Sequence, residues 1–358
     1  MLLRLVADDL TGALDAAAPF ASEQSPVRLI LPGAAVHNDT HPKLAISTES
    51  RALQEGEARR LVSEAVERLR SGSNAQTLWF KKVDSVLRGH PLAETIEMAR
   101  AAGLTHCVFA PAFPEMGRIT REGIHLFRNQ QGDWEPTSQG DLHAAFQELL
   151  AGLAPSLTVT VTDAQTTQQL RDAVLQRKDL PTTLWAGSRG LAQALGAQNA
   201  MLPTPALGLI VIGTTHPATR AQALRLTALT EPVPAQGTFS PAHTAPLLLD
   251  PVPFCTDGDG TRKAIAQALR RLQPPYDGSA IFVTGGDSLT VMLDVLGATA
   301  VECLGEIDRG LPLARIVGGR MDGTMMVTKS GGFGEPELLQ KLVFRGNDAA
   351  ICAGCSHP

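Results

Sequence analysis

Short apolar runs alternate along the chain with longer amphipathic stretches, and most apolar runs end in a polar turn. Runs of three to six apolar residues suit buried strands, and the amphipathic stretches have helical spacing. In the first half, we expect strands at Leu2–Val6, Val27–Leu31, Leu44–Ile46, Leu78–Phe80, His106–Ala110, Thr158–Val161 and Thr183–Ala186. Helices such as Gln54–Leu69 and Thr167–Arg177 lie between them. This order predicts a mainly parallel sheet with helices on both faces.

The alternation stops at Ala197–Ala206, which has two prolines and no apolar period, and then restarts. The second half predicts strands at Leu207–Ile212, Ala280–Val283 and Met325–Thr328, and helices at Ala218–Leu229, Gly260–Leu272, Leu289–Leu296 and Glu335–Leu342. The segment Thr120–Thr137 reads as loops or a small hairpin. A length of 358 residues favours two domains. We therefore expect an α/β protein of two α/β domains, residues 1–200 and 206–358.

Composition narrows the function classes. The apolar fraction of 44% suits a globular protein, and the net charge of −5 argues against a nucleic-acid partner. No apolar run reaches membrane-span length, and acids at Asp8 and Asp9 do not fit a signal peptide, so we expect a cytoplasmic protein. Five scattered cysteines suit a reducing compartment. Cys352 and Cys355 form a CxxC without a second pair, and we expect no metal site.

Polar side chains gather where the strands of the first half end. Asp8 and Asp9 follow the first strand and Arg51 the third. The fourth strand leads into a dense polar stretch with Lys81, Lys82, Asp84, Ser85 and Arg88. Carboxyl ends of parallel strands are where α/β sheets bind ligands. Carboxylates accept or deprotonate hydroxyls and arginines grip carboxylates, so the set suits a small polyhydroxy acid. The alternatives are a solvated loop and a helix cap by Asp9 or Thr11.

Three turns of the second half resemble one another: GTTHPAT at Gly213–Thr219, TGGDS at Thr284–Ser288 and KSGGFG at Lys329–Gly334. Each combines glycine with hydroxyls and opens a helix, as phosphate-binding turns do. Lys329 is expected to add a mobile cation. The GxGxxG and Walker fingerprints are absent, which disfavours a dinucleotide-dependent oxidoreductase and a P-loop enzyme. The two halves together predict phosphoryl transfer from a nucleotide to a hydroxyl of a sugar acid.

Several motifs in this order resemble the four-carbon acid sugar kinase family, from one end of the chain to the other. They are ADDLTGALD at Ala7–Asp15, TESR at Thr48–Arg51, KKVDSVLRG at Lys81–Gly89, APAFPEMGR at Ala110–Arg118, AGSRGLA at Ala186–Ala192, GTTHPATRAQ at Gly213–Gln222, TGGDS and KSGGFG. The resemblance implies a kinase that uses ATP, with Mg²⁺, to phosphorylate threonate, erythronate or their 3-oxo forms. It implies an acid-sugar-binding domain at residues 1–200, an ATP-binding domain at 206–358, and an active site in the cleft between them.

The resemblance also implies roles for single residues. Substrate contacts fall on Asp9, Arg51, Asp84, Ser85 and Arg88. Contacts with ATP fall on the turns of the second half, at Thr214, Gly285, Gly286, Asp287, Ser288, Lys329, Gly331 and Gly332. Either Asp9 or Asp84 is the base, and either Arg51 or Arg88 is the carboxylate clamp.

Three positions depart from the family pattern. His90 stands where Asn is frequent, Thr214 replaces a serine, and Asp287 replaces a glutamate. These departures leave open a non-catalytic sensor that binds a sugar acid or a nucleotide. The sequence also leaves open whether the chain forms a homodimer.

Overall fold

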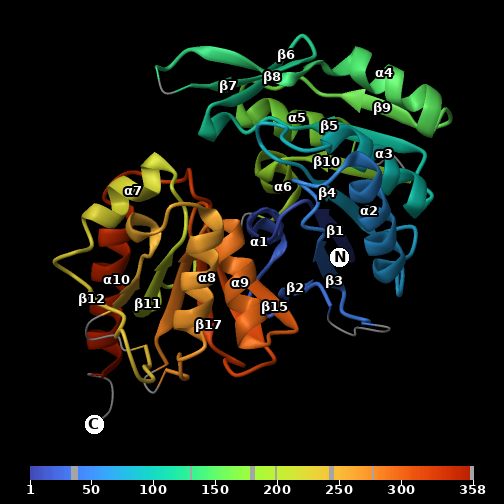
Figure 1. Cartoon of the computed structure of the whole chain (residues 1–358). Helices are drawn as coiled ribbons and strands as arrows, with labels where there is room; N and C mark the ends of the chain where they lie inside the picture. The colour runs from blue at the N-terminus through green and yellow to red at the C-terminus, as the bar shows by residue number, and fades with distance from the viewer. Residues whose placement is uncertain are drawn as a thin grey trace. The chain divides into compact units, whose positions relative to one another are not determined.

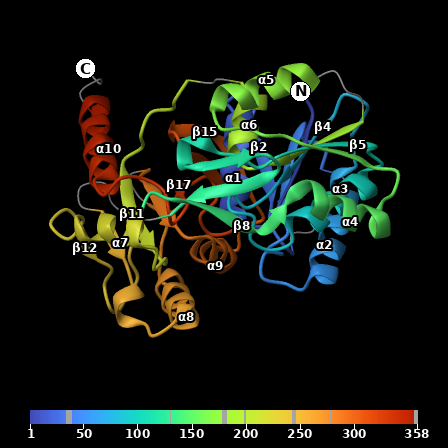
Figure 2. The same ribbon diagram turned by 90° about the horizontal axis from the view of Figure 1, so that it is seen from above.

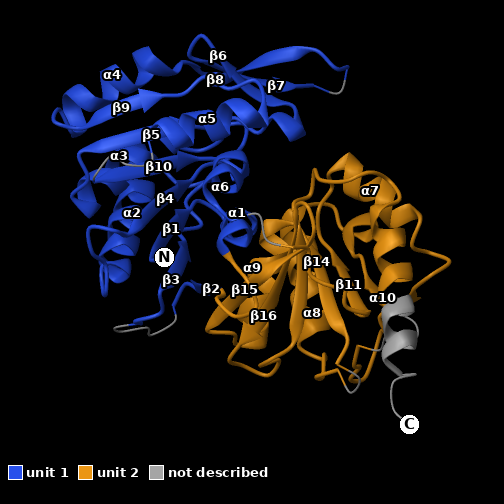
Figure 3. Ribbon diagram, turned by 180° about the vertical axis from the view of Figure 1, so that it is seen from behind, with its two compact units in different colours: residues 1–20, 27–199 blue, residues 21–26, 200–358 orange. Residues whose placement is uncertain are grey.

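The computed structural model describes residues 1–33, 39–129, 131–177, 182–197, 200–241, 246–275 and 278–354, without the side chains of 347–354. The CxxC of Cys352 and Cys355 therefore lies outside the described side chains. The chain divides into two compact units (Figure 3). Unit 1 consists of residues 1–20 and 27–199, and unit 2 of residues 21–26 and 200–358.

Unit 1 is built on a parallel sheet with the strand order β2-β3-β1-β4-β10-β5-β9. Its strands are β1 (Leu3–Ala7), β2 (Val27–Ile30), β3 (Lys43–Ser47), β4 (Leu78–Lys82), β5 (His106–Ala110), β9 (Thr158–Val161) and β10 (Thr183–Gly187). Its helices are α1 (Leu10–Ala17), α2 (Glu55–Leu69), α3 (Pro91–Ala102), α4 (Leu142–Leu153), α5 (Thr167–Arg177) and α6 (Arg189–Leu195), with the short η1 (Ala18–Phe20) and η2 (Pro114–Met116).

Helices cover both faces of this sheet, as the sequence pattern predicts. Helices α5 and α6 lie on one side and α2 and α3 on the other (Figure 2). Buried residues of the central strands, such as Val6 and Leu184, pack with Val62 of α2 and Ile96 of α3 in one hydrophobic core. Strands buried on both faces need no alternation of polar and apolar residues, which explains their continuous apolar runs.

The segment after β5 differs from its sequence prediction. In place of loops or a small hairpin, it forms a three-stranded antiparallel sheet of β6 (Arg118–Arg121), β7 (Ile124–Arg128) and β8 (Trp134–Asp141). The third strand reads as polar because most of β8 is exposed. The pairing of β8 with β7 is therefore not predicted by any apolar pattern in the sequence.

Unit 2 has a mixed sheet with the order β12-β13-β11-β14-β17-β16-β15. Its strands are β11 (Leu207–Ile212), β12 (Glu231–Pro232), β13 (Leu247–Leu249), β14 (Ala280–Thr284), β15 (Ala300–Asp308), β16 (Leu311–Val317) and β17 (Met325–Lys329). Its helices are α7 (Pro217–Leu224), α8 (Gly258–Leu269), α9 (Gly286–Leu296) and α10 (Leu338–Gly354), with the short η3 (Val252–Phe254). Helix α8 packs on α9, and α7 on α10 (Figure 1).

Several elements of unit 2 differ from expectation. The antiparallel pair β15 and β16 was not predicted, although the sheet remains mainly parallel. Helix α7 ends at Leu224 and not at Leu229, and the following residues form turns in which Arg225, Leu226 and Leu229 donate to the carbonyl three residues earlier. Helix α10 begins at Leu338, three residues later than predicted. No helix in the described part of the chain is long and apolar enough to cross a membrane.

Candidate active site

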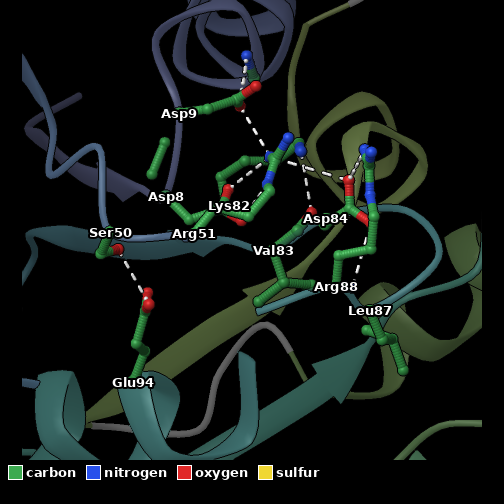
Figure 4. Close-up of polar contacts among 12 residues, drawn as sticks. Asp8, Asp9, Ser50, Arg51, Lys82, Val83, Asp84, Leu87, Arg88 and Glu94 are labelled. Carbon is green, nitrogen blue, oxygen red and sulfur yellow. Dashed lines mark hydrogen bonds and ion pairs between the residues drawn. The ribbon is translucent and has the colours of Figure 1, made fainter. Parts of the chain in front are cut away.

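The polar residues that follow three neighbouring strands of unit 1 lie together (Figure 4). Strands β3, β1 and β4 are adjacent and parallel, with Ala7 paired to Ser47 on one side and to Lys82 on the other. Their carboxyl ends therefore reach the same edge of the sheet. This brings residues some forty positions apart in sequence into one charged cluster, which we define as Asp8, Asp9, Arg51, Lys82, Asp84, Arg88 and Arg118.

Arg51 lies at the centre of the charged cluster. Its Nε and Nη2 donate to the two carboxylate oxygens of Asp8 at 2.8 and 2.9 Å. Nη2 also lies 2.9 Å from Asp9 Oδ1 and 3.7 Å from Asp84 Oδ1. Burial alone would lower the pKa of Arg51, but the bond to Asp8 and the nearby carboxylate charges raise it instead. Arg51 is thus a permanent cation that holds three carboxylates in place.

Asp84 is the most strongly bonded carboxylate of the cluster. Oδ2 accepts from the backbone N–H groups of Val86 and Arg88 at 3.2 and 3.1 Å and from Arg88 Nε at 2.9 Å. Oδ1 accepts from Arg88 Nη2 at 2.7 Å. Burial would raise the pKa of Asp84, but the Arg88 bonds and the charge of Arg51 hold it far below its usual range. A carboxylate stabilised in this way is a poor proton acceptor.

Asp9 has fewer donors around it. Oδ1 accepts from the backbone N–H of Gly12 at 2.9 Å, and Oδ2 accepts from the Thr11 hydroxyl at 3.0 Å. The interpretation of Asp9 as a helix cap is therefore confirmed, because it is the N-cap of α1. The same side chain also pairs with Arg51 and is 18% exposed, against 6% for Asp8 and for Asp84. Asp9 is thus the most accessible of the three carboxylates.

Both lysines at the end of β4 are buried, so neither of them faces solvent. Lys81 Nζ lies 2.8 Å from Glu94 Oε2 on α3, and Glu94 Oε1 accepts from the Ser50 hydroxyl at 2.9 Å. Lys82 Nζ donates to the carbonyl oxygen of Val83 at 2.8 Å. The reason is that β4 lies between β1 and β10 in a sheet covered on both faces, so neither side of the strand reaches water.

Two residues of the three-stranded sheet also take part, and our sequence reasoning gave neither a role. His125 is buried, and its Nε2 donates to the Ser85 carbonyl at 3.0 Å while Nδ1 lies 3.0 Å from the Thr120 hydroxyl. Arg118 donates from Nη1 to the Met116 carbonyl, but its buried Nε has no hydrogen-bond partner. Burial lowers the pKa of Arg118, and the charge of Asp84 partly restores it. The only available signal for Arg118 was its place in the APAFPEMGR motif.

His90, one of the departures from the family pattern, is turned towards the loop before α2. Its Nε2 lies 2.9 Å from the carbonyl oxygen of Leu53. The residue is also the N-cap position of α3, without a side-chain cap bond. Its imidazole therefore has a structural partner.

The three glycine-rich turns of unit 2 lie side by side at the carboxyl ends of β11, β14 and β17. The backbone N–H of Gly213 donates to the Thr284 carbonyl at 3.4 Å, and the Thr284 hydroxyl donates to the Lys329 carbonyl at 3.2 Å. Thr214 lies against two turns, since a Cβ added at Gly331 would be 2.8 Å from its hydroxyl and one at Gly285 would be 3.5 Å from its Cβ. The turns therefore form one compact surface with helix N-termini beside it.

Glycine is required at two points of this surface. A Cβ at Gly213 would fall 1.8 Å from Ser288 Oγ, and Gly285 has a φ of +101° at the N-cap of α9. Gly286 is the first residue of α9, and Ser288 is buried. Asp287 points away from the helix core, with a side chain 75% exposed and 3.1 Å from Arg262 Nη1.

The position of Lys329 differs from the sequence expectation. It was predicted to be a mobile cation, but it is 1% exposed, and its Nζ donates to the Thr219 hydroxyl and to carbonyl groups of its own turn. Gly332, another expected contact, lies against His216, because an added Cβ would be 3.1 Å from the imidazole Nε2. Within the residues that the structure describes, no group of three His, Cys, Asp or Glu side chains is arranged to hold a metal ion.

The comparisons with known proteins match both units. A family model described as a sugar-binding N-terminal domain matches residues 3–144, and one described as a nucleotide-binding C-terminal domain matches residues 251–339. A D-threonate kinase of Bordetella bronchiseptica is 30% identical, over 94% of this chain and 95% of that protein. A D-threonate kinase of Cupriavidus necator is 28% identical over the same shares.

A solved structure supports the fold. The crystal structure of a Haemophilus influenzae protein of the DUF1537 family has a TM-score of 0.65 at 16% identity, covering 96% of this chain and 100% of that one. At this identity the likeness concerns the fold alone.

Two α/β units, one with a sugar-binding domain and one with a nucleotide-binding domain, define a phosphotransferase class of protein. The chain belongs to the four-carbon acid sugar kinase family. It is accordingly a kinase, a transferase that binds a nucleotide and acts on a small molecule.

Proposed function

We propose that the protein transfers the γ-phosphoryl group of ATP to a hydroxyl of a four-carbon sugar acid of the threonate, erythronate or 3-oxo-tetronate type. Residues 206–358 supply the ATP-binding domain and residues 1–200 the acid-sugar-binding domain. The observation that carries the proposal is the convergence of the three glycine-rich turns of unit 2. Its relatives named D-threonate kinase and D-erythronate kinase support the substrate class.

The backbone of the third glycine-rich turn, Lys329–Gly334, can bind an anion. Among the described residues, the backbone N–H groups of Gly331, Gly332 and Gly334 have no acceptor, whereas that of Phe333 bonds to the Ser330 carbonyl. Free N–H groups in a glycine turn, beside helix N-termini, bind phosphate well. The hydroxyl of Thr214 lies against Gly331 and adds a further donor. We assign the phosphates of ATP to this surface, with Gly285, Gly286, Asp287 and Ser288 beside them.

The charged cluster of unit 1 suits the acceptor. Its four cations, Arg51, Lys82, Arg88 and Arg118, surround three carboxylates, and Lys81 is neutralised by Glu94. One positive charge is therefore left for an anionic ligand such as the carboxylate of a sugar acid. Arg51 is fully engaged with aspartates, so we assign the carboxylate clamp to Arg88, whose side chain is 65% exposed, with Arg118 beside it. Ser85 and the aspartates would bind hydroxyl groups.

We assign the base to Asp9. Asp84 is stabilised as an anion by four hydrogen bonds, so it would hold Arg88 in place and accept a proton poorly. Asp9 is more exposed and has a single contact with a cation, so its oxygens can reach a hydroxyl. A carboxylate in this role orients the attacking oxygen and accepts its proton as the phosphoryl group arrives.

Mg²⁺ is expected to accompany ATP. Oxygen donors suit this ion, and the turns of unit 2 offer the exposed carboxylate of Asp287 and the hydroxyl of Thr214. The metal would neutralise charge on the phosphates during transfer.

The test is an ATP-consumption assay with a panel of four-carbon acids, namely both enantiomers of threonate and erythronate and their 3-oxo forms. We expect at least one acid to stimulate ADP release by orders of magnitude. Calorimetric binding of ATP or an acid without turnover of any of them would select the sensor, which the departures at His90 and Thr214 left open. A chain that binds no nucleotide would overturn the proposal.

A further inference from the structure

Lys329 is buried under the phosphate-binding turn that follows it. Its ammonium donates three hydrogen bonds of ordinary length, to the Thr219 hydroxyl at 2.9 Å and to the carbonyls of Ser330 and Phe333 at 2.9 and 3.0 Å. The carbonyl of Gly331 lies a little farther away, at 3.5 Å. An ammonium has three protons, and each of them meets an oxygen here.

These bonds determine which way the peptide groups of the turn point. With the carbonyls of Ser330 and Phe333 drawn towards Lys329, the N–H groups of the intervening glycines are left unbonded. Thr219 reinforces this arrangement, since its hydroxyl donates to the Gly331 carbonyl at 2.6 Å. Gln222 does so too, with Nε2 bonded to the carbonyls of Phe333 and Gly334 at 3.1 and 2.9 Å. The turn therefore presents donors to an anion because its acceptors are already satisfied.

Among the residues that the structure describes, no carboxylate forms an ion pair with this lysine. Charged side chains on and beside the neighbouring helices pair with one another: Arg220 with Asp250, Arg225 with Glu337 and Arg262 with Asp287. One titratable group, His216, lies against the turn beside Gly332, and Glu335 directly follows the turn. Burial without a counter-ion lowers the pKa of Lys329 to about 7.

We propose that Lys329 is a positioning residue that shapes the turn in its charged form, so that the binding of nucleotide phosphates is accompanied by the uptake of a proton on its amine. The inference rests on the proposed function, and it replaces a direct contact between Lys329 and the phosphates. A neutral amine would direct a lone pair at an oxygen atom, and it would lose one of the three bonds that hold the carbonyls. A bound phosphate supplies the negative charge that the free protein lacks at this point.

The direction of the pH dependence follows from this. An anion near the amine favours the charged form, so the pKa of Lys329 is higher in the complex than in the free protein. The contribution of Lys329 to nucleotide affinity is then full below pH 7 and falls as the pH rises between the free and the bound pKa, by up to about tenfold per unit.

The test is calorimetric titration of the full chain with ADP in HEPES and in Tris, whose different ionisation enthalpies report the protons taken up. At pH 8 we expect an uptake approaching about 0.9 proton, because a group with a pKa near 7 is then mostly neutral in the free protein. In Lys329→Met we expect no such uptake and weaker binding. The matched control is Lys341→Met, which removes one exposed lysine of α10 and should take up protons as the wild type does.

Equal proton uptake by the wild type and Lys329→Met would overturn the inference. So would a wild type that takes up no proton at pH 8, a measurement that needs no variant and remains valid if Lys329→Met does not fold. Failure of the wild type to bind ADP at any pH would instead contradict the proposed function, so the two failures are distinguishable.

Discussion

Asp9 and Asp84 lie in the same charged cluster, but they accept different hydrogen bonds, which favour different chemical roles. Asp84 receives four hydrogen bonds, three of them from Arg88, and its pKa is held far below the usual range. Asp9 is shared between the first turn of α1 and one nitrogen of Arg51. The sequence predicted both aspartates at strand ends but could not assign them different roles. The difference lies in the hydrogen-bond donors around each carboxylate, and these are known only from the folded structure.

Replacing these two aspartates by asparagine should therefore have different kinetic effects. For Asp9→Asn we expect kcat to fall by about 10² to 10⁴, since a general base is lost, with little change in the KM for the sugar acid. Asparagine still caps a helix, so the free energy of unfolding should change by less than about 1 kcal/mol. For Asp84→Asn we expect chiefly a higher KM, because Arg88 loses its anchor. Steady-state kinetics with both substrates distinguish the two, and a larger loss of kcat in Asp84→Asn would return the role of base to Asp84.

Buried lysines are the residues for which sequence reasoning was least adequate. Lys81, Lys82 and Lys329 follow apolar runs and read as the first polar residues of a loop, but each is the last or next-to-last residue of its strand. Their alkyl stems fit the sheet, and their amines contact carbonyl or carboxylate oxygens of the loops and of α3 beside it. The sequence alone does not predict the oxygen atoms that these amines contact.

At the scale of elements, a buried ion pair fastens α3 to β4 and to the loop that carries Arg51. Lys81 and Glu94 are 0% and 1% exposed, and Glu94 also accepts from Ser50, the neighbour of Arg51. Removal of one partner leaves the other charge buried alone, which typically costs about 3 to 5 kcal/mol. Replacing both partners by apolar residues typically costs little free energy of unfolding. We therefore expect the ion pair to affect the position of Arg51 more than the net stability of the protein.

A double-mutant cycle tests this. We expect Lys81→Met and Glu94→Leu each to lower the free energy of unfolding by about 3 to 5 kcal/mol. The double variant should recover most of that loss while its KM for the sugar acid stays raised. Urea unfolding and steady-state kinetics supply the two quantities. Additive losses in the double variant would show that the two charges do not compensate each other.

Gly89 joins the loop of β4 to the backbone of Arg51. Its φ is +76°, and an added Cβ would lie 3.0 Å from the Arg51 carbonyl oxygen. Gly103, after α3, has a φ of +71° with nothing within 4 Å of such a Cβ, so Gly103→Ala is the matched control.

Both alanine variants should lose about 1 to 2 kcal/mol of stability from the left-handed conformation. We expect Gly89→Ala alone to raise the KM for the sugar acid, by about fivefold if it displaces Arg51 at a cost near 1 kcal/mol. Unfolding curves and kinetics of the two variants provide the measurement. An unchanged KM in Gly89→Ala would mean that the contact with Arg51 is not important for binding.

The elements that the sequence predicted well are those with continuous apolar runs between polar turns. Strands β5, β9 and β11 and helix α5 have the predicted bounds. The antiparallel pair β15 and β16 and the strand β8 were missed, since their pairing depends on neighbours distant in sequence or on mostly exposed residues. Glycine turns were visible in the sequence, but their mutual contacts through Thr214 and Ser288 were not.

On the scale of the whole molecule, each unit has its own sheet and its own set of polar residues at the carboxyl ends of its strands. Unit 1 has one more cation than anion in its charged cluster, and unit 2 has free N–H groups in the third turn. Neither set is sufficient for phosphoryl transfer, because the acceptor and the donor each need binding and orientation. We therefore expect phosphoryl transfer to require both units.

The measurement that tests this most directly is ³¹P NMR of the purified full chain with ATP, Mg²⁺ and each four-carbon acid in turn. We predict that one or more acids yield a new phosphomonoester signal whose amount equals that of the ADP formed, and that Asp9→Asn slows its appearance by about 10² to 10⁴ without loss of ATP binding. ADP formation that is no faster with any acid than without one, in a protein that binds ATP, would contradict the account.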